Sequence, residues 1–260
     1  MEVHAHTPTP RKKLTHYFWE FLMLFLAVFC GFLAENQREH MIEHQREKQY
    51  MVTMLEDLKA DTSLLNSTIR DWEQVNYSID SVADAISFPI TTANLPKAYR
   101  HINEALNYWS FMYNDRTISQ LKNSGSFRLI RNKIVANQII AYDRVNSDAV
   151  KNIALQHNKF HENATALRSR VFVEEIITGI HKVYKNEPAP SSIDPWIDSL
   201  ISKRKMPLTV EDQTRLLFEF KNSLLALKRD YDSNMTWGYK TTKRLINELI
   251  TVIQENYHLK

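Results

Sequence analysis

Glycine is scarce in this sequence, at only 4 of 260 residues, where roughly 7% is usual. A many-stranded β-sandwich or barrel needs glycine at its tight turns, and phosphate-binding loops need several glycines close together. Because the glycines lie at positions 31, 125, 179 and 238, neither G-x-x-x-x-G-K nor G-x-G-x-x-G can occur. The composition therefore argues against such β folds and against nucleotide-binding loops of these two kinds.

Cysteine is rarer still, because Cys30 is the only one. A disulfide within the chain is therefore excluded. The cysteine count does not distinguish an oxidising from a reducing compartment. No G-x-S-x-G motif marks a serine nucleophile. Neither sign of charge dominates, since 33 basic and 30 acidic residues leave a formal net charge of +3, and we expect no nucleic-acid partner. With 43% hydrophobic and 24% charged residues, the chain is predicted to fold around a core.

One long hydrophobic run is present. Residues 17–34 contain a single charge, Glu20, near the outer end, and about 20 apolar residues span a bilayer as a helix. A cleaved signal peptide and a buried helix are the alternatives, but Phe32 is too large for a cleavage site after Ala34, and Phe29 is too large before a lipoprotein Cys30. We predict an uncleaved single-span anchor, with a tail at 1–16, the transmembrane helix at 17–35 and a helical bundle domain at 36–260.

The prolines divide the rest of the chain. Since proline disrupts helix interiors, long helices fit the proline-free stretches 11–88, 97–187 and 208–260. Each stretch carries apolar residues at helical spacing, and none alternates with period two, which predicts an all-α fold. The expected buried stripes comprise Met51, Leu55, Leu58, Leu65, Ile69, Trp72, Ile79 and Ile86; Val135, Ile139, Tyr142, Val145, Ala149, Ile153, Phe160, Ala164, Leu167 and Val171; and Leu217, Phe220, Leu224, Leu227, Tyr231, Met235, Leu245, Leu249 and Val252.

Segment lengths suggest the topology. Residues 36–88, 131–183 and 208–257 are each about fifty residues long, and three rods of matched length bury their stripes best side by side. Residues 97–124 predict a shorter fourth helix that ends at a reversal around Gly125. Residues 184–207 are predicted to form an irregular connection with one short helix around Trp196. We therefore expect the transmembrane helix to continue into an elongated antiparallel bundle of three long helices plus a shorter fourth.

Two histidine pairs are candidate metal ligands. His40, Glu43 and His44 fit the H-x-x-E-H pattern of inverted zinc peptidases, but no glutamate between residues 104 and 162 offers a third ligand. A solvated, salt-bridged helix next to the membrane accounts for all of these residues, and we favour a chance match to the motif. His157 and His161 form the second pair, and the H-E-x-x-H motif fails because Thr165 replaces its second histidine. We expect His157 to be a hydrogen-bonded core residue, with a metal or pH-sensing role as the alternative, and we assign no catalytic, cofactor or metal residue.

Three further features each have an ordinary explanation. Ala27 and Gly31 form a small-xxx-small pair that would let two transmembrane helices approach closely, although such pairs are common by chance. The remaining two are basic clusters that would suit an anionic partner. Such clusters are usually charged side chains on a solvent-exposed surface. These clusters are Arg128, Arg131 and Lys133, and Lys203, Arg204 and Lys205.

Four segments resemble a family of uncharacterised bacterial single-span proteins: residues 20–36, 47–50, 55–61 and 115–133. The last of them is similar to the family motif T-x-x-x-L-x-x-S-G-x-x-x-L-I, which falls on residues 117–130. The resemblance covers roughly residues 17–145. It implies an envelope-anchored helical protein without a known activity, and it supplies no catalytic residues.

These observations favour a membrane-anchored, non-enzymatic helical interaction or scaffold module of the bacterial cell envelope, with a protein partner or a second copy as its target. The alternative is a ligand-sensing helical bundle that acts through a partner protein, its small-molecule ligand unknown. The third hypothesis is a metal-dependent hydrolase whose metal ligands are His40 and His44. A polar pocket between the helices would favour sensing, and an exposed apolar patch would favour a protein partner.

Basic residues near the membrane helix predict its orientation. Three consecutive basic residues, Arg11 to Lys13, precede the helix, whereas Arg38, Arg46 and Lys48 are spread among acidic residues after it. Moving the dense upstream cluster across the bilayer is opposed by the membrane potential, while a long downstream segment can be exported largely regardless of its charges. We predict a single-pass protein of the bacterial inner membrane with a cytoplasmic N-terminus and a periplasmic bundle.

Overall fold

The computed structural model of the chain describes residues 14–87, 94–108, 110–186 and 210–259, together with residues 195 and 199. Within its helices, the side chains of residues 14, 149–157, 182–186 and 210–212 lie outside this description. The described residues form helices joined by turns and short irregular segments, and no β-strand occurs among them. The all-α prediction is therefore confirmed.

The chain divides into two compact units, Met1–Met51 and Val52–Lys260, and helix α1 (Leu14–Ala85) contributes to both. In the first unit, α1 carries an apolar window of mean hydropathy 2.0 whose side chains are not buried by the protein. Phe21, Leu24 and Val28 are each about two-thirds exposed. Among the described residues, α1 is the one helix long and apolar enough to cross a membrane.

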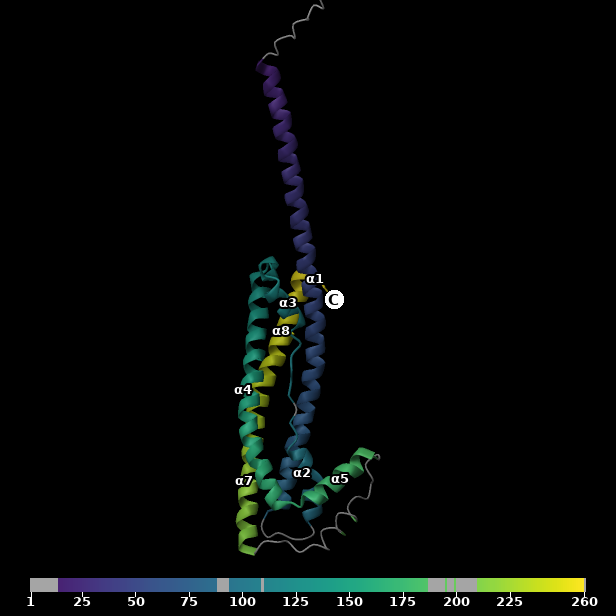
Figure 1. Ribbon diagram of the computed structural model, residues 1–260, viewed down its shortest axis with the longest axis vertical. Coiled ribbons are helices and arrows are strands. Elements are labelled where there is room, and N and C mark those ends of the chain that lie inside the picture. Colours follow the sequence, from purple (N-terminus) through teal and green to yellow (C-terminus); the bar gives the residue numbers. More distant parts are fainter. Residues whose placement is uncertain are drawn as a thin grey trace, which may run out of the picture. The chain divides into compact units, whose positions relative to one another are not determined.

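The second unit is a helical bundle in which α4 (Lys133–Val171) packs against α7 (Val210–Asn234) and α8 (Lys240–Tyr257) (Figure 1). A π-helical turn, Met235–Tyr239, joins α7 to α8. The predicted stripes form much of the core, because one residue in each helical turn faces inward. Predicted residues that are buried include Leu58, Leu65, Trp72, Ile79, Val135, Ile139, Tyr142, Phe220, Leu224, Leu227, Tyr231 and Leu249.

The π-helical turn changes which residues of α8 face the core. A π turn holds one residue more than an α turn, which rotates the residues beyond it about the helix axis. Ile246 and Ile253 are buried and the predicted Leu245 and Val252 are only half-buried, whereas Leu249 is buried as predicted. The stripe predicted from an unbroken helix is thus displaced by one residue at these two places.

Hydrogen bonds fix the directions of the long helices. Asn66 and Asp80 of α1, and Ser87 just beyond its end, accept from Lys243, Lys228 and Lys221 respectively, so the number of the partner falls as the number of the acceptor rises. Asn146 and Asn132 likewise pair α4 with Thr242 and Asn256. The rod formed by α7 and α8 therefore runs antiparallel to both α1 and α4. Helices α1 and α4 run in the same direction, because residues 94–132 carry the chain back along the bundle between them (Figure 1).

The returning segment contains two short helices instead of the single helix expected over 97–124. These are α2 (Leu95–Ala105) and α3 (Arg116–Asn123), followed by a 3₁₀ turn, Ser126–Leu129. The reversal is at Gly125 as predicted, with φ of 67°, a conformation that favours glycine. Asn132 then caps α4, since its Oδ1 accepts from the backbone N–H groups of Ile134 and Val135 at 2.8 and 3.3 Å.

The helix expected over 131–183 is interrupted at Phe172. Its backbone is extended, with φ of −107° and ψ of 150°, and α5 (Glu174–Asn186) begins two residues later. The Phe172 ring is buried and makes edge contacts with Tyr99 and Phe220. Burial of this side chain at the bend explains the break. The short helix predicted around Trp196 falls outside the described residues.

Candidate functional site

The residues of the H-x-x-E-H pattern form two separate pairs. His40 Nδ1 lies 3.8 Å from a carboxylate oxygen of Glu43, and His44 Nδ1 lies 3.3 Å from one of Glu47. Both histidines are more than half exposed. Among the described residues, no group of three or more His, Cys, Asp or Glu side chains is placed to hold a metal ion.

The other residues singled out from the sequence are dispersed. Cys30, Ala27 and Gly31 are exposed along α1, and Arg128 and Lys133 are exposed near the Gly125 turn. The structure brings none of these residues into a binding site. The His157 side chain and the basic run 203–205 lie outside the described residues.

His161 has a definite partner. Its Nε2 donates to the backbone carbonyl of Leu106 over 2.8 Å, which ties the chain after α2 to α4. The ring is only half-buried because it also lines the pocket described below.

Two buried carboxylates on α1 bind the start of α3. Asp57 Oδ2 accepts from both the backbone N–H and the hydroxyl of Thr117. Asp57 Oδ1 accepts from the side-chain amide of Asn114 at 2.9 Å and from Arg116 at 2.8 Å. Asp57 is only 2% exposed. A buried charge needs this density of donors, so Asp57 fixes α3 against α1.

Asp61 extends the same network to α4. Its Oδ1 accepts from the backbone N–H of Asn114 at 2.7 Å, and its Oδ2 accepts from the Tyr142 hydroxyl at 2.6 Å. Burial raises the pKa of Asp61, and the two hydrogen bonds oppose this effect. Because the folded chain then holds this proton more tightly than the unfolded chain, the stabilising contribution of Asp61 decreases as the pH rises through its pKa.

This network joins two of the segments that carry the family resemblance. Asp57 and Asp61 belong to residues 55–61, and Thr117 belongs to residues 115–133. The pairing gives a structural reason for polar residues at these positions. Asp57 and Thr117 are 60 residues apart, so no local sequence pattern predicts the hydrogen bonds between them.

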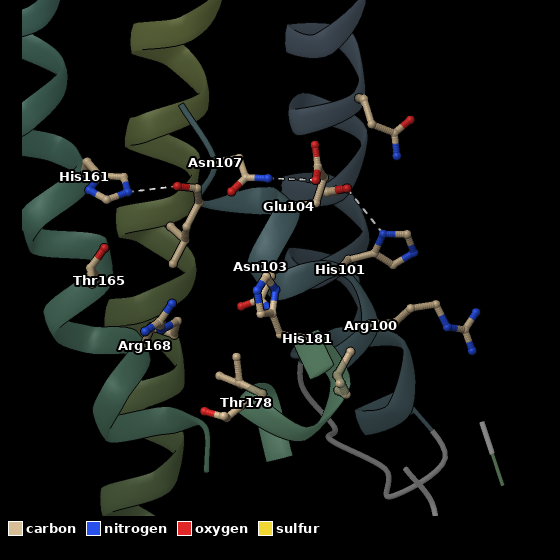
Figure 2. A pocket seen from close by; sticks show the side chains of 15 residues that line it. Arg100, His101, Asn103, Glu104, Asn107, His161, Thr165, Arg168, Thr178 and His181 are labelled. Carbon is tan, nitrogen blue, oxygen red and sulfur yellow. Dashed lines mark hydrogen bonds between the residues drawn. The ribbon is translucent and has the colours of Figure 1, made fainter. Parts of the chain in front are cut away.

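A pocket of about 820 Å³, with polar residues in the majority among those that line it, lies between α1, α2, α4 and α5 (Figure 2). Only three of the fifteen residues that line it are aliphatic, and none is Phe, Tyr or Trp. The ionisable lining residues are Arg100, Arg168, His101, His161, His181 and Glu104. The amide and hydroxyl residues are Gln74, Asn103, Asn107, Ser78, Thr165 and Thr178, and the aliphatic residues are Leu106, Ile177 and Ile180.

Hydrogen bonds hold the α2 side of the pocket in place. The Asn107 amide donates to Glu104 at 2.9 Å, and His101 Nδ1 lies 3.3 Å from the Ser78 hydroxyl. Burial, reinforced by the positive charge of Arg100, lowers the pKa of His101. The neutral ring is therefore favoured here, and the fixed side chains leave a preformed wall.

The α4 side presents three polar residues on one face. His161, Thr165 and Arg168 follow at spacings of four and three, so they line the same side of the helix. In Figure 2 they face Thr178 and His181 of α5. The Arg168 Nε and Nη2 donate to Glu174 at 3.1 and 2.9 Å, which orients the guanidinium group.

The Thr165 hydroxyl is the unusual group in this wall. Its Oγ1 is buried but has no hydrogen-bond partner in the protein. Helical threonines often bond the carbonyl four residues earlier, as Thr62 and Thr68 do on α1. An unpaired buried hydroxyl costs about 1–3 kcal/mol, so a bound ligand that paired with it would gain affinity.

The sequence singles out His161 only as half of a histidine pair, and it does not predict the pocket. The spacing of His161, Thr165 and Arg168 is the signal that was available, because it places polar groups on one helical face. The remaining wall comes from three other helices, whose meeting depends on the tertiary fold.

Comparisons with known proteins give no relative for this chain. No family model, curated protein or solved structure matches it. The resemblance argued from residues 17–145 therefore stays a prediction, and the functional argument rests on the pocket and on the apolar segment of α1.

Proposed function

We propose that this chain is a membrane-anchored, non-enzymatic ligand-binding module, whose bundle takes up a small molecule in the pocket and signals its presence to a partner protein. The observation that carries the proposal is the pocket itself, with its volume of about 820 Å³ and the many polar residues among those that line it. Pockets of roughly 300–1,000 Å³ are typical of small-molecule sites. Such a pocket favours the sensing alternative over a passive scaffold.

The segment that follows α2 links the pocket to a second part of α1, apart from the Gln74 and Ser78 that line it. Leu106 lines the pocket and accepts the hydrogen bond of His161, while Asn114, near the other end of this segment, donates to Asp57 and Asp61 on α1. A ligand that moved this segment would change contacts on the helix that continues from the apolar anchor. This connection supports a sensing role.

The bundle carries exposed apolar residues to which a partner protein would bind. Phe218 and Leu225 of α7 are 65% and 41% exposed, and seven residues apart they share one face of the helix. This face favours a second function, as an interaction scaffold. The two functions are compatible, because a sensor must bind a partner protein to pass on its signal.

The low-molecular-mass fraction of a cell extract tests the ligand-binding proposal. We expect this fraction to raise the Tm of the detergent-solubilised full chain by several degrees, because a ligand that binds only the folded state stabilises it. Thr178→Trp, which fills the pocket from an exposed position, should abolish the rise. Glu175→Trp, on the same helix but outside the lining, should retain it. An unchanged Tm in the wild-type chain would refute the function.

For the anchor, we propose insertion of residues 17–35 in a bacterial inner membrane, with the N-terminus in the cytoplasm and the bundle in the periplasm. A phosphatase joined after Lys260 should then be active, because it folds only after export. A fluorescent protein that matures only in the cytoplasm should stay dark at the same position. Fluorescence without phosphatase activity would reverse the orientation.

A further inference from the structure

We propose that the ligand of the pocket is a small organic oxyanion, a molecule with a carboxylate or phosphate group that Arg168, His181 and Thr165 bind. This inference rests on the proposed function and specifies its ligand class. It follows from the charge of the lining, from the side chains that the lining lacks, and from the placement of hydrogen-bond donors.

Positively charged and protonatable groups outnumber acidic ones in the lining. Two arginines and three histidines stand against one carboxylate, Glu104, which already accepts a hydrogen bond from Asn107. The Glu174 carboxylate lies outside the lining and binds Arg168 through one edge of its guanidinium group. Guanidinium and imidazole groups donate hydrogen bonds to anions, so the lining offers an anion more donors than repelling carboxylates.

The lining offers little to a cationic ligand, which needs several carboxylates or a cage of aromatic faces. The described lining has one carboxylate, no Phe, Tyr or Trp, and three aliphatic residues. Its volume of about 820 Å³ also exceeds what a bare inorganic ion would fill. An organic anion fits these limits.

Donors from two helices converge on the pocket. The buried Thr165 hydroxyl lacks a protein partner, and Arg168 is one turn away on the same face of α4. On α5, His181 and Thr178 face them in Figure 2, with Asn103 of α2 close by. Guanidinium, imidazole, hydroxyl and amide groups all donate hydrogen bonds to oxyanions. Such charge-assisted bonds are the stronger kind.

Fractionation of the cell extract tests the class of the ligand. We expect the component that raises the Tm of the full chain in detergent to be retained on an anion-exchange resin at neutral pH. If that component instead appears in the unretained fraction, the oxyanion class is wrong although the proposed function stands. If no fraction raises the Tm, both fail.

Titration with pure compounds tests the residues. Citrate supplies carboxylates and glycerol 3-phosphate supplies a phosphate, with glucose as the neutral probe. We expect at least one anion to bind the full chain in calorimetry and glucose not to bind. Binding of glucose alone, or of none of the three, would overturn the oxyanion class, because the site recognises the group that citrate and glycerol 3-phosphate present.

Matched variants separate binding from structure. Arg168→Gln should weaken binding of the anion by about tenfold or more, and Thr165→Val by about threefold or more. Glu174→Gln breaks the same ion pair as Arg168→Gln but keeps the cation, so it should bind the anion at least as tightly as the wild-type chain. Thr251→Val, at an exposed position of α8, should bind normally. Equal losses in Arg168→Gln and Glu174→Gln, or no loss in Arg168→Gln and Thr165→Val, would overturn the proposal.

Discussion

Replacing Leu224 with aspartate is expected to lower the free energy of unfolding by about 3 kcal/mol or more. Leu224 is fully buried in the bundle, and the substitution places a charge without a partner in the core while it removes apolar contacts. Leu65→Asp on α1 should have a similar effect, because Leu65 is equally buried. Urea unfolding of the solubilised full chain, followed by circular dichroism, measures the loss.

The neighbouring leucines provide matched controls. Leu225 and Leu64 are 41% and 43% exposed, so aspartate at either position keeps its contact with water. We expect each control to change stability by less than about 1 kcal/mol. Equal losses at buried and exposed positions would show that the helical faces are assigned incorrectly.

Asp57→Ala is expected to cost about 2–4 kcal/mol of unfolding free energy, the second large effect. The change removes the acceptor for the Thr117 backbone and hydroxyl and for the Asn114 amide, and it leaves these donors without a partner. Each buried donor that loses its partner costs about 1–3 kcal/mol, and partial relaxation or water entry reduces the sum. The same urea titration measures the effect.

Two further variants test the cause of this loss. Asp57→Asn keeps one acceptor oxygen and should lose about half as much stability. Glu56→Ala removes an exposed carboxylate that also contacts Arg116, so it should change stability by less than about 1 kcal/mol. If Asp57→Ala were as stable as the wild-type chain, the network would not fix α3 to α1.

Periodicity predicts the core of this fold well where helices are regular. Leu58, Leu65 and Trp72 recur every seven residues, and all are buried. The pattern fails where the backbone departs from α geometry. The π turn before α8 buries Ile253 in place of Val252, and the extended backbone at Phe172 divides a predicted helix. Such local changes leave the spacing of apolar residues almost unaltered.

Tertiary pairings escape prediction for a different reason. Asp57 and Thr117 are 60 residues apart, and no local rule specifies that one will bind the other. The parallel course of α1 and α4 also depends on where residues 94–132 lead the chain. The pocket follows from that course, since Ser78 of α1 meets His101 of α2 only after the chain turns back.

His161 shows that a polar residue considered without its neighbours on the helix can suggest the wrong kind of site. Its spacing from His157 suggests that His161 is half of a metal-binding pair. In the structure its Nε2 binds the Leu106 carbonyl, and its neighbours on the same face are Thr165 and Arg168. The helical spacing of four and three residues is therefore more informative here than the spacing of the two histidines.

A structure of the full chain, determined in detergent with the extract fraction that raises its Tm, tests ligand binding in the pocket most directly. We predict well-defined non-protein density between α4 and α5, within hydrogen-bond distance of the Thr165 hydroxyl and of Arg168. Ligand density at another place, or only ordered water in the pocket under conditions in which the Tm has risen, would contradict the proposed binding site.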